Sequence, residues 1–168
     1  GIYAAGALTI QGETNGTGTL FVNSGEHINS GNAWTYSAAF YADGDLTVKG
    51  GAVTAQGGKT SSAECAFSIG VQLSKGHSLS VSGGTLTTIG GESFDTGDPN
   101  DVDESFSEGI YTENGNVTVS VNGKLIVKTV PSMADKFLSY GLNIVSGSLT
   151  VKDSASVSAT ACRAVKVY

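Results

Sequence analysis

The residues with the clearest potential for chemistry lie in an acidic segment near the middle of the chain. Between Glu92 and Glu104, four aspartates and two glutamates occur within thirteen residues. Calcium takes about six to eight oxygen ligands, which carboxylates and backbone carbonyls of such a segment can supply. The spacing differs from that of an EF-hand loop, and a solvated acidic insertion would have the same composition. The segment predicts calcium as a cofactor, with Asp95, Asp98, Asp101 and Asp103 as candidate ligands.

Four aromatic residues form a second group that could bind a ligand. A tyrosine or tryptophan combines a flat apolar face with an O–H or N–H group, which suits contact with a sugar ring. Three tyrosines occupy equivalent positions in the repeats described below, and the tryptophan stands in an inserted segment. Gln72 interrupts the series, and ordinary stacking between neighbouring strands is the alternative role for such tyrosines. The predicted carbohydrate-binding residues are Tyr3, Trp34, Tyr41 and Tyr111.

The sequence does not contain a recognisable catalytic group. His27 and His77 stand in different turns or loops, without a second histidine or a cysteine nearby. The G-x-S-x-G pattern of a nucleophile elbow is missing as well. The expected outer faces carry Tyr, Thr, Ser, Gln and Asn, whereas catalytic β-helices place Arg, Lys or several Asp on one face. We therefore expect that the chain is not an enzyme.

Composition and charge narrow the classes of fold and partner. The formal net charge is -6, and Arg163 is the only arginine, which argues against nucleic acid and anionic membranes as partners. No apolar run approaches the ~20 residues that a membrane-spanning helix needs. The 24 glycines and 2 prolines, with 14% charged residues, suit many short strands joined by tight turns. We expect a folded all-β chain that does not insert into a membrane.

One unit recurs along the chain and must position these residues. Each copy has a small residue, an apolar residue, a glycine turn and an apolar-Thr/Ser-apolar triplet. After a second turn, a third short strand follows around Leu20, Val53, Leu86, Leu125 and Val157. Five copies align: GIYAAGALTI, AFYADGDLTV, GVQLSKGHSLSV, GIYTENGNVTV and GLNIVSGSLTV, from Gly1, Ala39, Gly70, Gly109 and Gly141.

The copies differ in length mainly after the third strand. Insertions there occupy residues 23–36, 56–67, 89–106 and 128–138, and each returns through an aromatic or leucine followed by serine. A stacked solenoid tolerates insertions at one corner because each coil contacts only its neighbours. The pattern predicts a single-domain right-handed parallel β-helix (β-solenoid) over 1–168, with about five coils of three short strands and variable loops at one corner. A β-propeller is the main alternative, but its blades need four antiparallel strands, whereas each unit here has three.

Alternation within the strands assigns the inner and outer faces. We expect Cys65 and Cys162 to be buried thiols without a bridge, because they lie about three coils, or ~14 Å, apart and a disulfide needs Cα atoms within roughly 7 Å. The predicted inner column is Ile2, Phe40, Val71, Ile110 and Leu142, and the predicted outer ladder is Thr9, Thr47, Ser80, Thr118 and Thr150.

The two ends of the chain fall within repeats. Gly1 begins one copy midway, and Tyr168 stops another. We therefore expect a fragment of a longer protein, in which at least one terminal coil presents unpaired strand edges. Such edges make end-to-end self-association a further expectation.

The repeats resemble those of a known family. The segments GIYAAGALTI, GDLTVKGGAVTAQGG, SLSVSGGTLTTIGG and EGIYTENGNVTV are similar to the coils of secreted or surface β-helix proteins of anaerobic bacteria, notably a calcium-dependent carbohydrate-binding family. The resemblance covers nearly the whole chain. It implies a non-catalytic module that binds a polysaccharide, such as a host or plant glycan, outside the cell or at its surface. The alternative is a structural stalk or adhesin segment without glycan affinity.

Overall fold

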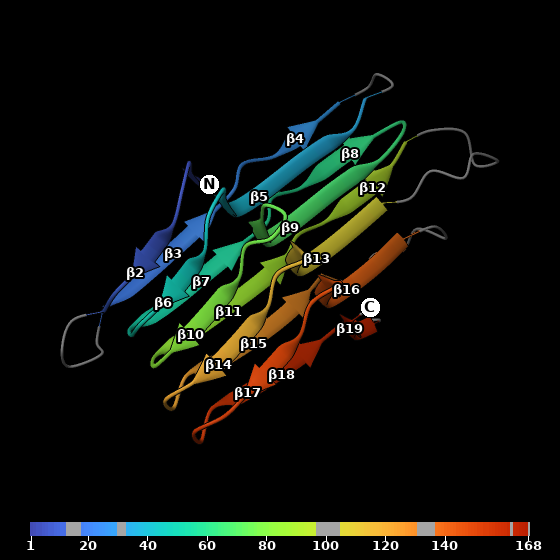
Figure 1. Cartoon of the computed structure of the whole chain (residues 1–168). Coiled ribbons are helices and arrows are strands. Elements are labelled where there is room, and N and C mark those ends of the chain that lie inside the picture. The colour runs from blue at the N-terminus through green and yellow to red at the C-terminus, as the bar shows by residue number, and fades with distance from the viewer. Residues whose placement is uncertain (13–17, 30–32, 97–104, 131–136, 162, 168) are drawn as a thin grey trace.

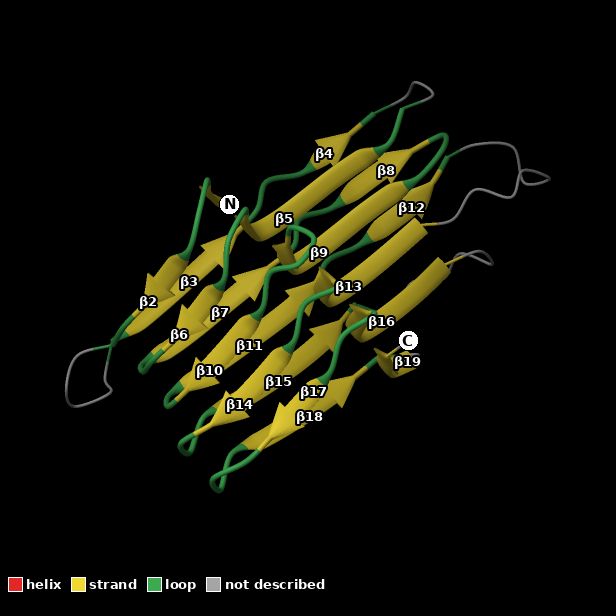
Figure 2. Ribbon diagram, viewed as in Figure 1, coloured by secondary structure: helices red, strands yellow, loops and turns green. Residues whose placement is uncertain are grey.

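The computed structural model describes residues 1–12, 18–29, 33–96, 105–130, 137–161 and 163–167. Every regular element within these residues is a β-strand, and every strand pairing is parallel (Figure 1). Figure 2 shows the coloured part of the chain as strands joined by loops and turns, without a helix. This arrangement confirms the predicted all-β parallel solenoid.

Four sheets run along the stack of coils. Sheet A has the order β1-β5-β9-β13-β16-β19, sheet B β17-β14-β10-β6-β2, sheet C β18-β15-β11-β7-β3, and sheet D β12-β8-β4. The chain visits sheets A, B and C once in each of five coils, and β19 adds a sixth strand to sheet A.

Sheet A contains β1 (Ile2–Ala4), β5 (Thr35–Ala42), β9 (Ala66–Leu73), β13 (Ser105–Glu113), β16 (Phe137–Val145) and β19 (Arg163–Val167). Sheet B contains β2 (Leu8–Ile10), β6 (Leu46–Val48), β10 (Leu79–Ser82), β14 (Val117–Ser120) and β17 (Leu149–Val151). Sheet C contains β3 (Thr19–Asn23), β7 (Ala52–Gln56), β11 (Thr85–Gly90), β15 (Lys124–Thr129) and β18 (Ser156–Thr160). Sheet D contains β4 (His27–Ile28), β8 (Thr60–Ser62) and β12 (Ser93–Asp95).

The register confirms the predicted columns. In sheet A, the inner column pairs Ile2, Phe40, Val71, Ile110 and Leu142 in succession. The last four of these are fully buried, whereas Ile2 is 37% exposed because its coil has a neighbour on one side only. In sheet B, the outer ladder pairs Thr9, Thr47, Ser80, Thr118 and Thr150 as predicted.

The inserted corner differs from the prediction in two ways. First, part of each early insertion is a strand, because sheet D lies within the segments expected to be loops. Second, the first strand of each later coil starts before the aligned repeat. Residues expected as the return from the insertion already pair in sheet A: Tyr36 with Phe67, Phe67 with Phe106, and Phe106 with Leu138. The strands of sheet A are therefore eight or nine residues long in coils 2 to 5.

One skipped position divides each of these long strands into two halves, and it is a glycine in β9, β13 and β16 and Ala39 in β5. The pairing between β13 and β16 skips Gly109 and Gly141, and it resumes at Ile110 and Leu142. A Cβ atom on Gly109 would lie 2.1 Å from Cγ1 of Val127 and 2.7 Å from the carbonyl oxygen of Gly141, so the position has no room for a side chain. Side chains along a strand normally alternate between the inner and the outer face, but Gly109 and Ile110 are successive buried residues. The alternation therefore shifts by one residue at this point. The outward residues are Glu108 before the glycine and Tyr111 after it.

Three remaining predictions concern single features. Cys65 is a half-buried thiol rather than a buried one, and Cys162 lies outside the described residues. The first coil is open on one side, because β1, β2 and β3 each stand at the edge of their sheet. The described part of the chain contains no helix with the length and apolar character needed to cross a membrane.

Candidate functional site

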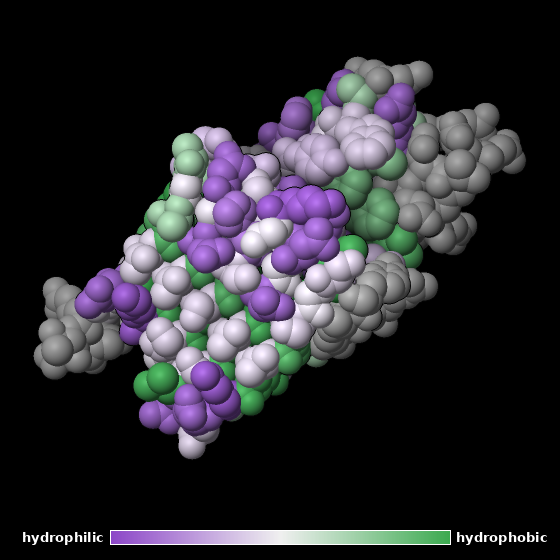
Figure 3. Space-filling model, in the orientation of Figure 1, coloured by the Kyte–Doolittle hydropathy of each residue, from purple (hydrophilic) through white to green (hydrophobic). Residues whose placement is uncertain are grey.

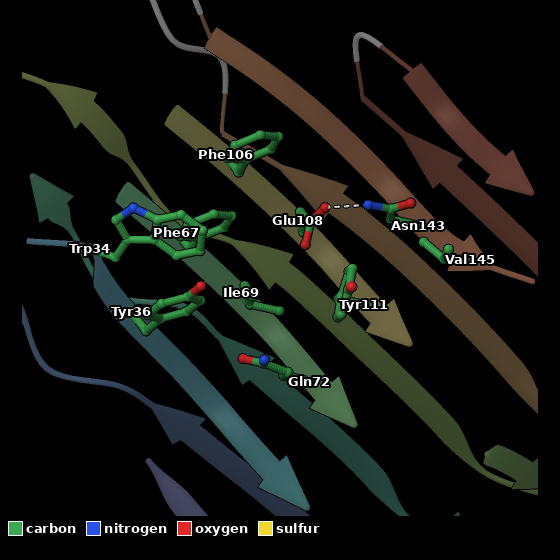
Figure 4. A pocket seen from close by; sticks show the side chains of 10 residues that line it. All are labelled: Trp34, Tyr36, Phe67, Ile69, Gln72, Phe106, Glu108, Tyr111, Asn143 and Val145. Atoms are coloured by element: carbon green, nitrogen blue, oxygen red, sulfur yellow. Dashed lines mark hydrogen bonds between the residues drawn. The ribbon is translucent and has the colours of Figure 1, made fainter. Parts of the chain in front are cut away.

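A pocket of about 410 Å³ lies on the outer face of sheet A. Matched outward positions of successive parallel strands bring side chains from distant parts of the sequence together (Figure 4). In Figure 3, pale and green side chains gather over this part of β5, β9 and β13. The lining residues come from the loop before β5 and from β5, β9, β13 and β16: Trp34, Tyr36, Phe67, Ile69, Gln72, Phe106, Glu108, Tyr111, Asn143 and Val145. We call this pocket the sheet A cleft.

One wall of the cleft is a ladder of aromatic rings. The centroids of Tyr36 and Phe67 are 4.5 Å apart, and those of Phe67 and Phe106 are 4.8 Å apart, with nearly parallel planes in both pairs. These spacings follow the separation of neighbouring strands, so stacking along the coils holds the rings in place. The faces of Phe67 are covered by its two neighbours. The ladder therefore stabilises the stack and leaves mainly ring edges for a ligand.

Trp34 and Tyr111 differ from the ladder residues. Trp34 is 59% exposed and is tilted by 43° against Phe67, with the centroids 5.9 Å apart. Tyr111 stands in register with Gln72 on one side and Asn143 on the other, so its strand neighbours are amides rather than rings. These two residues are the aromatic side chains of the cleft best placed to offer a ring face to a ligand.

The polar side of the cleft is formed by Glu108 and Asn143. Although they face outward, only 2% of Glu108 and 7% of Asn143 is exposed. Nδ2 of Asn143 donates a hydrogen bond of 2.6 Å to Oε1 of Glu108 (Figure 4). Oδ1 of Asn143 is buried and has no hydrogen-bond partner among the residues that the structure describes. The pair leaves an unsatisfied acceptor at a site where a ligand could supply a donor.

The two tyrosines of the cleft carry hydroxyl groups that remain protonated at neutral pH. Burial is the main cause that raises the pKa of Tyr36, with smaller contributions from Cys65, Tyr111 and Glu108. Burial also raises the pKa of Tyr111, and the nearby carboxyls of Glu113 and Glu108 raise it further. Both phenols can thus donate a hydrogen bond to a ligand.

The predicted aromatic strip is divided between two places. Trp34 and Tyr111 line the cleft, whereas Tyr3 and Tyr41 stack on each other at 5.6 Å. The hydroxyl of Tyr3 donates to Oδ2 of Asp43 at 2.5 Å, and the hydroxyl of Tyr41 lies 3.1 Å from Oγ of Ser74. Ser74 also donates to Asp43. Tyr3 and Tyr41 therefore belong to a hydrogen-bonded network outside the cleft.

The predicted calcium ligands mostly lie outside the described residues. This holds for Asp98, Asp101 and Asp103 and for the side chain of Asp95, whose backbone closes β12. Within the described residues, no three His, Cys, Asp or Glu side chains form a group that could hold a metal ion. Calcium binding by the acidic segment stays a prediction.

Sequence reasoning missed most of the cleft, namely Tyr36, Phe67, Phe106, Glu108 and Asn143. A signal for the ladder was present, because Tyr36, Phe67 and Phe106 each stand three residues before the start of a repeat. Such a constant offset indicates continued pairing rather than a loop. Glu108 directly precedes the start at Gly109, so the same extension would have placed it on the outer face.

Comparisons with known proteins assign neither a family nor a function, because no protein-family model, curated protein or solved structure matches the chain. The proposals below therefore depend on the geometry of the cleft and on the sequence resemblance.

Proposed function

We propose that the chain is a non-catalytic module that binds carbohydrate in the sheet A cleft. The observation that carries this proposal is that Trp34 and Tyr111 line the same pocket as the buried polar pair Glu108 and Asn143. A sugar ring has an apolar face for an aromatic residue and hydroxyls for polar groups. Binding sites commonly combine apolar walls with a few fixed polar groups in this way.

The extent of the cleft suits an oligosaccharide rather than a single sugar. Its lining side chains come from four neighbouring strands, β5, β9, β13 and β16. Three strand spacings of ~4.8 Å correspond to about 14 Å along the solenoid. A polysaccharide running along the coils could thus contact Trp34 near β5 and Asn143 on β16 at the same time. The net charge of -6 disfavours nucleic acid as the partner.

A binding role is favoured over catalysis by the number of carboxyl groups. Most glycoside hydrolases place two carboxyls on either side of the bond that they cleave. Among the described residues that line the cleft, Glu108 is the only one with a carboxyl group. We therefore propose that the module holds a glycan without cleaving it.

Calcium and the location of the protein complete this proposal. The family resemblance and the acidic segment support calcium as an ion for Asp95, Asp98, Asp101 and Asp103, and the resemblance supports an extracellular or cell-surface location. Calcium that binds only the folded chain would raise its melting temperature. The Asp101→Asn, Asp103→Asn double variant should lose this rise. Equal melting curves with and without calcium for the parent would contradict the proposed metal role.

A glycan array tests the binding function. We expect the parent to retain a polysaccharide on an array run with calcium and with EDTA, and we expect Trp34→Ala to weaken that binding by about tenfold or more, because it removes the exposed ring of the cleft. Tyr3→Ala is the matched control, since it removes an exposed aromatic ring outside the cleft. A parent that retains no glycan, or equal losses in both variants, would contradict the proposal.

A structural stalk is the second candidate function. It is favoured by the ladder Tyr36, Phe67 and Phe106, whose rings use their faces on one another and so stiffen the stack. A stalk should show no glycan affinity. It should still lose stability when Phe67 is shortened, so the array and the stability measurement together separate the two functions.

A further inference from the structure

We infer that one linear glycan chain bridges two separate aromatic subsites of the sheet A cleft, one at Trp34 and one at Tyr111. The cleft therefore selects extended oligosaccharides over single sugars and short fragments. This inference rests on the proposed carbohydrate-binding function and specifies the length and shape of the ligand. It is carried by the separation of the two rings and by the side chains that line the cleft between them.

The rings of Trp34 and Tyr111 lie far apart along the direction of the strands (Figure 4). Trp34 packs beside the aromatic ladder, with its centroid 5.9 Å from that of Phe67 and 6.4 Å from that of Tyr36. Phe106 is the ladder residue in register with Phe67, and Tyr111 follows it by five residues in β13. At a rise of ~3.3 Å per residue, five residues of strand span about 15 Å. Ring contacts need centroids within about 7 Å, so a sugar stacked on Trp34 cannot also stack on Tyr111.

Each of the two rings can stack on a sugar independently of the other. Trp34 is 59% exposed and is tilted against the ladder rather than stacked on it. Tyr111 is half-buried, and its partners in the strand register, Gln72 and Asn143, are amides. The ladder rings nearby use their faces on one another. Among the described residues, the cleft thus offers two separate places for a sugar face and not one continuous aromatic platform.

A chain that runs from Trp34 to Tyr111 passes over β9, where Ile69 and Gln72 line the cleft. Ile69 provides an apolar floor between the two rings (Figure 4). Gln72 is half-buried, and its side-chain amide makes no hydrogen bond with the residues that the structure describes. Such an amide has both donors and an acceptor, so it can bind the hydroxyls of a sugar. Neither side chain carries a charge, so this path places no demand on the charge of the glycan.

Bridging makes the affinity depend on the length of the glycan. Once one part of a chain is stacked on Trp34, its contact with Tyr111 becomes intramolecular, and the effective concentration for this contact is high only if the chain can span the gap. A short fragment can occupy one subsite or the other but not both. We therefore expect the affinity to rise by about tenfold or more from a disaccharide to a hexasaccharide, and both rings to be needed for that rise.

Calorimetric titration with oligomers of defined length tests this inference. Linear disaccharides and hexasaccharides of glucose, mannose, xylose and galacturonic acid are titrated into the parent, with calcium and with EDTA. In at least one series the hexasaccharide should bind about tenfold or more tightly than the disaccharide, and either Trp34→Ala or Tyr111→Ala should remove this gain. Tyr3→Ala, which removes an exposed ring outside the cleft, should keep the full gain. Melting curves show whether each variant is folded, and Tyr111→Leu, which keeps an apolar side chain without a ring, replaces Tyr111→Ala if that variant is not.

The outcomes separate this inference from the proposed function. A disaccharide that binds the parent as tightly as its hexasaccharide, and loses affinity in Trp34→Ala, would overturn the inference while the binding function stands. A gain with length that persists in the Trp34 or the Tyr111 variant would overturn it as well, because the longer chain would then not bridge the two rings. If no oligomer of any series binds, both the inference and the proposed function fail.

Discussion

Asn143 donates its side-chain amide to Glu108 across strands β13 and β16, although the two residues are not partners in the strand register. Glu108 is opposite Tyr140, and Asn143 is opposite Tyr111 on the far side of the skipped glycine position. The hydrogen bond thus connects the two halves of the long strands. It holds together the polar side of the cleft at the point where regular pairing is interrupted.

Removal of the Asn143 amide should destabilise the fold. Asn143→Leu keeps the size of the side chain but deprives the buried Glu108 of this donor, and we expect a loss of about 1–3 kcal/mol in the free energy of unfolding. Urea denaturation measures this loss. Gln72→Leu is the matched control, because Gln72 occupies the same outward column in β9 but is only half-buried. Equal losses in the two variants would contradict a special role for the pair.

The repeat pattern made the registers of sheets A, B and C predictable. An apolar-Thr/Ser-apolar triplet keeps both of its apolar residues buried against those of its copy in one register only, because a slip by one residue turns them outward and a slip by two leaves one of them without an apolar partner. Thr118 therefore had to meet Thr150, and Ile110 had to meet Leu142, as the structure has them. The hydrophobic period alone contains this information.

The cleft could not be predicted in the same way because glycine suggested a boundary. Gly70, Gly109 and Gly141 begin the aligned repeats, and a glycine in that place usually marks a turn. Here they are extended residues within long strands, and tight packing explains why Gly109 has no side chain. The relative orientation of rings is also not encoded in spacing. Tyr3 and Tyr41 could thus be placed in one column, but their engagement with Asp43 could not be foreseen.

The aromatic ladder should contribute measurably to stability. Phe67→Ala removes the central ring and both of its stacked contacts, with Tyr36 and with Phe106. Each such contact contributes about 0.5–1.5 kcal/mol, so we expect a loss of about 1–3 kcal/mol in the free energy of unfolding. Phe21→Ala is the control, since Phe21 is largely exposed, and it should cost less than about 0.5 kcal/mol. A similar loss in both variants would show that the ladder adds no stability.

The skipped glycine position should not accept a side chain. In Gly109→Ala the new Cβ atom would meet Val127 and the backbone of Gly141, and we expect a loss of about 1–3 kcal/mol or more from overpacking. Gly25→Ala, where a Cβ atom would meet nothing within 4 Å, should stay within about 0.5 kcal/mol of the parent. If Gly109→Ala does not fold, the added substitution Val127→Ala should restore part of the stability by removing one of the two close contacts. No rescue, or no loss in the single variant, would contradict this account.

The Asp43 network should give the fold a dependence on acid pH. The hydroxyl of Ser74, followed by that of Tyr3, lowers the pKa of Asp43 from its ordinary value of 3.8. A carboxyl whose pKa is lower in the folded than in the unfolded chain stabilises the fold above the unfolded value, and this contribution is lost as pH falls through the folded value. We therefore expect the melting temperature of the parent to fall more steeply than that of Asp43→Asn between about pH 5 and about pH 2. Tyr3→Phe should show part of the difference between the parent and Asp43→Asn, since it removes one of the two donors to Asp43. Asp153→Asn is the control: it removes an exposed carboxyl elsewhere, so its melting curve should follow that of the parent. Parallel curves for the parent and Asp43→Asn would show that the network does not couple folding to the ionisation of Asp43.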